Sequence, residues 1–401
     1  MGNKYLDCIN NVCHGKSEAT DLAIRLAQHH TRNTEMITLD HAYHGHIISA
    51  LNISPYKLYQ QVDNSHLMPE HVYVVPCPDT YRGKYTDISH PEQDLGQLYA
   101  DEVKNAINKM KSQHKSPSFF IAESMQSCGG QIIYPPGYLQ KVYKYVHDAG
   151  GICIADEVQV GFGRVGSDYW AFQPQGVVPD IVTIGKPMGN GHPVAAVVTT
   201  KDISDSFKAS GMSYFNTYGG NPVSCAIASA VLDVIEKEKL ITHAKDVGQY
   251  WTDKLKSMMS EFSIIGDVRG LGLFLGIDLV KDRNSRAPAT EEADYVIERM
   301  KKEFIILSTD GPHSNVLKMK PPMTLNRDDV DFFCSKLAIV FKELENKNNN
   351  AMLDTNVTTE VSNTTSCHND NKVTDFLSEV QFNGSFPLTE TSGNTKSLKV
   401  Y

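Results

Sequence analysis

Short apolar segments that alternate with amphipathic helical segments constrain the fold of this chain more than any other feature. Residues 119–122, 152–155 and 181–184 have the composition of buried strands. Residues 100–110 and 138–149 carry apolar side chains at helical spacing. Buried strands that alternate with helices are typical of a largely parallel sheet covered on both faces. The sequence therefore predicts an α/β fold with a large, mostly parallel-sheet domain.

The pattern changes twice along the 401 residues. Residues 15–240 contain the predicted α/β domain, preceded by a short segment, 1–14. Residues 241–345 read as helices around a strand pair, which predicts a smaller α+β domain. Residues 346–401 are rich in Asn, Thr and Ser and have no apolar periodicity, so we predict a disordered, low-complexity tail.

Composition argues against several classes of partner. The formal net charge is −9 and no run of Lys or Arg stands out, which disfavours nucleic acid as a partner. No apolar run approaches membrane-spanning length, and no presequence is visible. The eight cysteines form no C-x-x-C pair, so the sequence predicts neither a zinc site nor a disulfide framework.

Two charged residues follow directly on predicted buried strands. Asp156 ends the strand at 152–155, and Lys186 follows the strand at 181–184 before a glycine-rich turn. Ligands of open α/β sheets bind outside the carboxyl ends of the strands, so both side chains should reach one crevice. A carboxylate there can keep a pyridine nitrogen protonated, and a partly desolvated lysine can form an imine and move protons. Either residue alone would equally suit a helix cap or a solvated surface.

A third segment, residues 215–222, places small and hydroxyl side chains before a predicted helix start. Such a segment can donate hydrogen bonds to a phosphate. By itself it would be read as an ordinary capped loop.

Taken together, these motifs resemble those of the class III aminotransferases, in family order. They are Tyr43-His44-Gly45, Glu123-Ser124-Met125-Gln126, residues 156–164, Lys186 and residues 216–222. The resemblance covers nearly all of residues 1–345 and implies the fold type I architecture of pyridoxal-phosphate enzymes. Residues 40–46, 78–85 and 318–322 look most like the ethanolamine-phosphate phospho-lyase branch, also called alanine–glyoxylate aminotransferase-like.

The resemblance implies a set of contacts with pyridoxal 5'-phosphate. Lys186 would be the Schiff-base lysine, and Asp156 would pair with the pyridine nitrogen. The other implied contacts are Val158 and Tyr43 on the two ring faces, Gln159 at the phenolic oxygen, and Ser17 and Thr217 at the phosphate. Thr217 would come from the neighbouring subunit, which implies a homodimer with shared active sites.

Two departures favour a phospho-lyase over a transaminase. Lys318 stands where many class III transaminases have an arginine for the substrate carboxylate, and Cys128 stands where they have a glutamate. The resemblance then implies elimination of phosphate from O-phosphoethanolamine to give acetaldehyde, ammonia and phosphate. Lys186 would be the general base. Lys318 and Arg82 are candidates for holding the substrate phosphate. 5-Phosphohydroxy-L-lysine and ordinary transamination remain alternatives. The family also suggests the mitochondrial matrix, with the cytoplasm as the other possibility.

One further departure affects the cofactor site itself. Family members continue from a segment resembling residues 10–14 into a long helical region and a strand, whereas here Gly15 follows at once. Residues 1–14 would thus be a remnant of a longer segment, and we predict that the missing strand leaves a sheet edge exposed. Lys16 replaces a family glycine beside Ser17, at the expected phosphate site. A second hypothesis is therefore that this chain is a truncated, non-catalytic partner that dimerises with a complete subunit.

Overall fold

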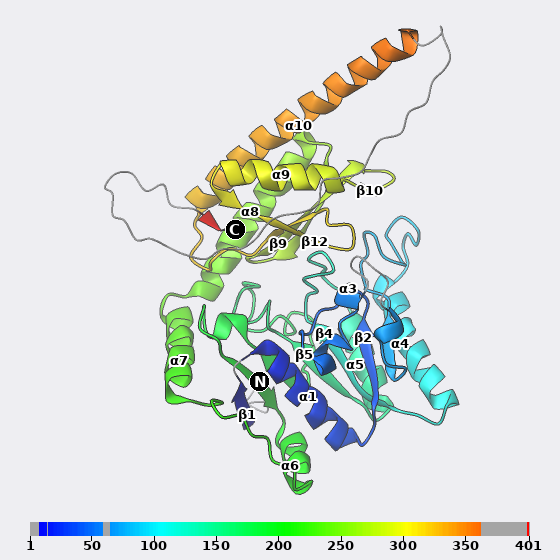
Figure 1. Ribbon diagram of the computed structural model, residues 1–401, viewed down its shortest axis with the longest axis vertical. Coiled ribbons are helices and arrows are strands. Elements are labelled where there is room, and N and C mark those ends of the chain that lie inside the picture. Colours follow the sequence, from blue (N-terminus) through cyan, green and yellow to red (C-terminus); the bar gives the residue numbers. More distant parts are fainter. Residues whose placement is uncertain (1–7, 14, 59–64, 362–398, 401) are drawn as a thin grey trace, which may run out of the picture.

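The computed structural model describes residues 8–13, 15–58, 65–361 and 399–400. A large domain built on one sheet carries a smaller domain above it (Figure 1). None of the helices in the described ranges is long and apolar enough to cross a membrane.

The sheet of the large domain has seven strands. Across the sheet they run β1 (Cys8–Cys13), β7 (Ala195–Thr199), β6 (Ile181–Ile184), β5 (Ile152–Asp156), β4 (Pro117–Glu123), β2 (Glu35–Leu39) and β3 (Val72–Val75). β7 runs antiparallel to both of its neighbours, β6 and β1, and all the other strand pairs of this sheet are parallel. This sheet confirms the predicted α/β fold with a mostly parallel sheet.

Helices cover both faces of this sheet because successive strand residues point to opposite sides. Phe119 and Ile121 of β4 pack in the core beneath α1 (Lys16–Thr31) and α6 (Lys201–Ala209). Phe120 and Ala122 pack in the core beneath α4 (Leu95–Ser112) and α5 (Tyr138–Asp148). Strands buried on both faces explain the continuous apolar runs in the sequence. The segment between β2 and β3 forms only short helices: α2 (Ile48–Leu51), α3 (Pro55–Leu58) and η1 (Ser65–Leu67).

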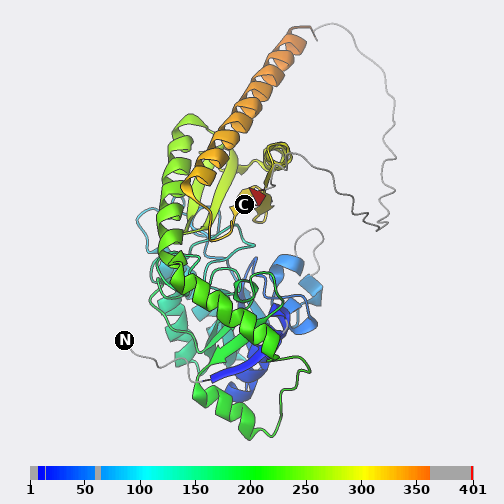
Figure 2. The same cartoon turned by 90° about the vertical axis from the view of Figure 1, so that its left-hand side faces the viewer.

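Two consecutive helices connect the domains. Helices α7 (Pro222–Lys237) and α8 (Leu240–Glu261) run along one side of the molecule from the large domain into the small one (Figure 2). The small domain contains β8 (Ile265–Leu271), β9 (Phe274–Asp282), β10 (Ala287–Pro288), α9 (Thr290–Lys302), β11 (Ile305–Ile306), β12 (Ser308–Asp310), β13 (Val316–Met319) and α10 (Arg327–Val361), and β14 (Lys399–Val400) pairs with β11. Its core packs the helices against the β8–β9–β13 sheet around Trp251 and Phe333, whose rings meet edge to face with centroids 5.0 Å apart.

The predicted loss of an edge strand is wrong. Residues 8–13 form β1, which pairs antiparallel with β7 along its whole length and so covers that strand's free backbone groups. The pairing has one register irregularity between Ile9 and Asn11. The short segment before Gly15 therefore completes the sheet.

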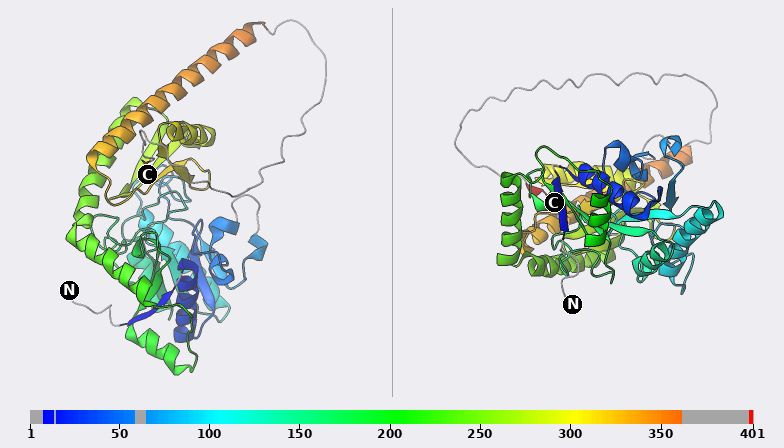
Figure 3. Two further views of the ribbon diagram at one scale, coloured as in Figure 1. Left: turned by 60° about the vertical axis from the view of Figure 1, so that its left-hand side comes forward. Right: turned by 90° about the horizontal axis from the view of Figure 1, so that it is seen from below.

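The chain also differs from the prediction just after residue 346. Helix α10 continues to Val361 and projects away from the small domain (Figure 3). Residues 346–361 contain neither proline nor glycine, so no residue type in this stretch forces the helix to stop. Of the remaining predicted tail, residues 362–398 and 401 lie outside the described residues.

Candidate active site

The carboxyl ends of three adjacent parallel strands bring the charged residues together. Glu123 at the end of β4 is in register with Asp156 at the end of β5. Asp156 is in turn in register with Thr183 of β6, and Lys186 begins the short helix η2 (Lys186–Met188) just beyond that strand. The structure thus brings Asp156 and Lys186 to one edge of the sheet, as the strand-end argument required.

The Lys186 side chain is accessible, and its pKa is lowered. The residue is exposed, whereas Ile184 and Gly185 immediately before it are buried. Desolvation by the surrounding protein and the nearby Lys16 ammonium lower the pKa of Lys186. A lysine with a lowered pKa is more often neutral at physiological pH, as a nucleophile or base must be.

Asp156 is almost fully enclosed, with 1% of its surface exposed, and it is held as an anion. Its Oδ2 accepts from His44 Nδ1 at 2.9 Å and lies 3.0 Å from Lys16 Nζ, and its Oδ1 accepts from the Val158 amide at 3.2 Å. Burial alone would raise the pKa of Asp156, but Lys16 and His44 outweigh it and hold the pKa well below its usual range.

Lys16 is the unexpected member of the site. Its Nζ donates to the Tyr43 carbonyl at 2.9 Å and lies 5.1 Å from the centroid of the Tyr43 ring. Burial alone would lower the pKa of Lys16, but Asp156 and Glu123 outweigh it and raise the pKa. The ammonium is therefore charged, and it pairs with the carboxylate that the family resemblance assigns to the cofactor ring.

Glu123 supports the loops around this pair. Its Oε1 accepts from the Tyr43 amide at 3.3 Å and its Oε2 from the Ser127 amide at 3.0 Å. Burial is the main reason that its pKa is raised, with the Asp156 carboxylate adding to it. Glu123 thus ties the Tyr43 loop to the loop after β4.

The start of α1 lies against the loop that carries Tyr43. The Ser17 hydroxyl accepts from the His46 amide at 3.0 Å, and the Thr20 hydroxyl donates to the His44 carbonyl at 2.9 Å. A Cβ on Gly45 would come within 2.7 Å of Ser17 Oγ, and Gly45 has φ +141°, so only glycine suits this close approach. Ser17 therefore lies at a helix N-terminus, the position predicted for a phosphate contact.

The other residues predicted to contact the cofactor differ in how far they are buried. Val158 is buried and lies close to the backbone of Gly185, the residue before Lys186, because a Cβ on Gly185 would meet the Val158 side chain at 3.5 Å. Gln159 is half-buried. Thr217 is exposed, and its neighbour Asn216 donates to Glu18 of α1 at 2.5 Å.

Two lysines from the small domain approach the loop after β4. Lys318 Nζ lies 3.0 Å from Asp310 Oδ1, and Lys320 donates to the Ser127 hydroxyl. Lys320 Nζ also lies 4.7 Å from the centroid of the Phe274 ring. Burial is the main reason that the pKa of Lys320 is lowered to about 7. The Asp310 carboxylate acts to raise this pKa, and the Lys318 ammonium acts to lower it. Sequence reasoning missed Lys320, although alternate strand positions would have placed it on the same side as Lys318.

Arg82 is already engaged elsewhere. Its guanidinium donates twice to Asp278, through Nη2 to Oδ1 at 2.6 Å and through Nε to Oδ2 at 3.1 Å, and it also donates to the Arg286 carbonyl. Asp278 is fully buried in the small domain. A bidentate pair of this kind is strong and directional, so Lys318 and Lys320 are better placed than Arg82 to meet a substrate phosphate.

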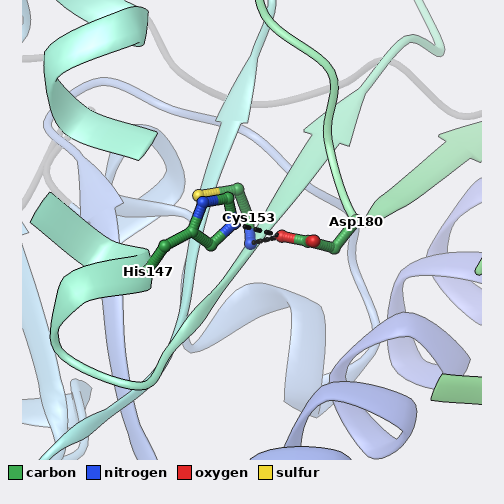
Figure 4. A group of neighbouring side chains, drawn as sticks. All are labelled: His147, Cys153 and Asp180. Carbon is green, nitrogen blue, oxygen red and sulfur yellow. Dashed lines mark hydrogen bonds and ion pairs between the residues drawn. The ribbon is translucent and has the colours of Figure 1, made fainter. Parts of the chain in front are cut away.

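At the opposite, amino-terminal end of the parallel strands, His147, Cys153 and Asp180 form a second cluster (Figure 4). One carboxylate oxygen of Asp180 lies 2.7 Å from His147 Nε2 and accepts from the Cys153 amide, also at 2.7 Å. Burial raises the pKa of the Cys153 thiol well above its usual value, which keeps it protonated. The contacts join the end of α5 to the starts of β5 and β6, and we assign no metal to them.

The fold and the strand-end lysine and aspartate define a class of protein, the pyridoxal-phosphate-dependent enzymes. The profile of the class III aminotransferases matches residues 5–341. The chain belongs to the class III aminotransferase family.

Individual relatives point in two functional directions. The chain is 55% identical over 318 residues to "Alanine–glyoxylate aminotransferase 2-like" of Drosophila melanogaster, an alignment that covers 79% of this chain and 64% of that protein. It is 45% identical over 327 residues to "Ethanolamine-phosphate phospho-lyase homolog 1" of Caenorhabditis elegans, covering 79% and 69%. The chain thus spans about two thirds of the length of these curated relatives.

Solved structures give the same picture. A phospholyase from Arthrobacter in complex with phosphoethanolamine superposes with a TM-score of 0.78 at 35% identity, covering 85% of this chain and 78% of that one. A PLP-bound amine transaminase from an uncultivated Pseudomonas species superposes at 0.75 with 27% identity, covering 83% and 76%. The cofactor of this family, bound in the second of these structures, is pyridoxal phosphate.

The residues present fit that cofactor with one exception. An accessible lysine with a lowered pKa, an ionised and enclosed aspartate, an aromatic ring and a hydroxyl at a helix N-terminus are the groups that its aldehyde, ring and phosphate require. The exception is Lys16, whose ammonium already pairs with Asp156.

Proposed function

We propose that this chain is a phospho-lyase that eliminates phosphate from O-phosphoethanolamine to give acetaldehyde, ammonia and inorganic phosphate. The observation that carries the proposal is the lysine pair, Lys318 and Lys320, beside the loop that holds Ser127 and Cys128. The relative named as a phospho-lyase homolog and the phosphoethanolamine complex of the similar structure support the same substrate.

Lys186 would move the proton. When bound, pyridoxal phosphate supplies an electron-accepting ring, kept protonated by Asp156. Neutral Lys186 takes the proton from the carbon that bears nitrogen. The bond between the adjacent carbon and the phosphate oxygen then breaks, and the electron pair leaves with the phosphate. Water completes the reaction by releasing acetaldehyde and ammonia.

The lysine pair would stabilise the departing phosphate. Burial lowers the pKa of Lys320 to about 7, so the arrival of a phosphate dianion would favour the charged form of this lysine. Cys128 would make no charged contact, because burial raises the pKa of its thiol to about 12. A glutamate at that position would repel a phosphate, whereas a neutral thiol does not.

Replacement of Lys320 by alanine is expected to raise KM for O-phosphoethanolamine by about tenfold or more, because a charge-assisted hydrogen bond contributes about 1.5–3 kcal/mol. In the wild type, Lys320 loses its proton as the pH rises through about 7, so KM should increase toward alkaline pH. This increase should be much smaller in Lys320→Ala and should persist in Lys201→Ala, which removes an exposed lysine of α6 and serves as the control. An unchanged KM and pH profile in Lys320→Ala would remove this residue from the substrate site.

Product analysis tests the proposed function itself. The purified protein, loaded with pyridoxal phosphate, should release inorganic phosphate and acetaldehyde in equal amounts from O-phosphoethanolamine. Accumulation of pyridoxamine phosphate with alanine as donor, without phosphate release, would instead support a transaminase. Preferential cleavage of 5-phosphohydroxy-L-lysine would move the chain to the sister lyase activity. Cofactor binding without any turnover would support the non-catalytic partner.

We also infer that the chain forms a homodimer through α7 and the loop before it. Several large apolar side chains there face solvent in the single chain, including Phe215 at 82% and Val223 at 64% exposure. Thr217, the residue predicted to reach the neighbouring subunit's phosphate site, lies between them. Contiguous exposed apolar surface is typical of protein interfaces.

Val223→Asp is expected to weaken the dimer by about tenfold or more, because burial of a valine side chain stabilises an interface by about 1.5–3 kcal/mol and a buried carboxylate opposes it. Sedimentation velocity over a range of protein concentrations would measure the shift toward monomer. Ile339→Asp, on the exposed side of α10, is the matched control and should leave the association unchanged. Equal effects of the two substitutions would place the interface elsewhere.

A further inference from the structure

The contacts of Lys16 coincide with those predicted for the cofactor ring. Its ammonium lies 3.0 Å from Asp156 Oδ2 and 5.1 Å from the centroid of the Tyr43 ring. Asp156 is the predicted partner of the ring nitrogen, and Tyr43 is predicted to stack on the ring. The Lys16 side chain is only 10% exposed, so this is an enclosed ion pair and not a surface contact.

We propose that Lys16 is a built-in counter-ion of Asp156 that competes with the cofactor for this carboxylate. The inference rests on the proposed cofactor site and adds a means by which this chain regulates the occupancy of that site. Binding of a protonated pyridine ring at Asp156 requires the ammonium to leave, because the two cations cannot share the same carboxylate face at hydrogen-bonding distance. The chain would therefore bind pyridoxal phosphate less tightly than it would with a neutral residue at position 16.

The local backbone allows such a side chain to move. Lys16 is the first residue of α1, and Gly15 before it is extended and makes no side-chain cap. A Cβ on Gly15 would meet nothing within 4 Å, so there is room around this turn. The long lysine stem can then carry the ammonium away from Asp156 without unfolding the helix.

The net charge of the enclosed site favours Lys16 as the resident cation. Asp156 and Glu123 both lie close enough to raise the pKa of Lys16, and His44 adds a hydrogen bond to the same Asp156 oxygen. Among the described residues His44 Nε2 has no hydrogen-bond partner. Removal of the ammonium would leave the enclosed carboxylate without its lysine partner, and a cationic ring would replace that partner.

Titration of the apo-protein with two ligands tests the competition. Lys16→Met keeps most of the stem and removes the charge, and Lys57→Met is the matched control because Lys57 Nζ lies 5.9 Å from the same Tyr43 ring centroid. We expect Lys16→Met to bind both pyridoxal phosphate and pyridoxal about tenfold more tightly or better, as measured by absorbance or intrinsic fluorescence. Lys57→Met should stay within about twofold of the wild type.

Pyridoxal lacks the phosphate, so comparing the two ligands shows whether Lys16 competes with the cofactor ring or helps to bind the cofactor phosphate. If Lys16 served the phosphate, Lys16→Met would weaken pyridoxal phosphate and leave pyridoxal unchanged, and this result would overturn the proposal. Unchanged binding of both ligands would overturn it as well. None of these readings requires turnover, so a failure of the proposed lyase activity would be seen separately in the phosphate-release assay.

A second measurement needs no variant. Brief acetylation of wild-type protein, followed by mass spectrometry of the peptides, reports how accessible each lysine is. Lys16 should be protected in the apo-protein and become several-fold more reactive when pyridoxal phosphate is added, whereas Lys57 should not change. A Lys16 reactivity that is the same with and without the cofactor would contradict the displacement.

Discussion

Replacement of Lys186 by alanine is expected to reduce the release of phosphate from O-phosphoethanolamine by about a thousandfold or more. The variant would lack both the cofactor's covalent attachment and the general base, and proton transfer by a positioned base alone contributes about 10²–10⁴-fold. The side chain is exposed, so the apo-protein should unfold at the same urea concentration as the wild type. Steady-state phosphate release at saturating cofactor measures the effect.

A surface lysine provides the control for this substitution. Lys201→Ala removes an exposed lysine at the start of α6 that pairs with its helical neighbour Asp205. Its activity should equal that of the wild type. Retention of more than a tenth of the activity by Lys186→Ala would show that another group removes the proton.

Asp156→Asn is expected to destabilise the apo-protein by about 3–5 kcal/mol, because it leaves the enclosed Lys16 ammonium without its partner. The double variant Lys16→Met/Asp156→Asn removes both charges and should recover most of this loss. Urea unfolding of the wild type, the two single variants and the double variant would give the coupling free energy. Additivity within about 0.5 kcal/mol would mean that the two side chains do not interact.

The strand-end reasoning succeeded because the parallel sheet fixes where strand ends lie. Asp156 and Lys186 each follow an apolar run, and the register of β5 and β6 brings both runs to the same edge. Glu123 could be placed in the same way from β4. These positions depend on backbone topology, which the alternation of strands and helices predicts well.

Contacts between distant segments were not predictable in this way. Lys16 reaches Asp156 across 140 positions because α1 packs on the Tyr43 loop, and only the folded chain shows that its ammonium lies beside Asp156 and the Tyr43 carbonyl. The pairing of Arg82 with Asp278 likewise joins the two domains. Nothing near either residue in the sequence signals these partners.

The short N-terminal segment shows a different limit. Its six strand residues were read as a remnant, although Ile9 and Val12 have the β-branched side chains that suit strands. Whether such a segment pairs depends on an available edge, which here is β7. The completed sheet removes one reason to doubt that this chain folds, whereas Lys16 remains the reason that cofactor binding has to be measured.

Mass spectrometry of the borohydride-reduced protein would show which lysine binds the cofactor. The purified chain would be loaded with pyridoxal phosphate, reduced with borohydride to fix any imine, digested and mapped. We predict loss of the visible absorbance and a phosphopyridoxyl group on Lys186. A phosphopyridoxyl group on Lys16 instead, or none on either lysine, would contradict it.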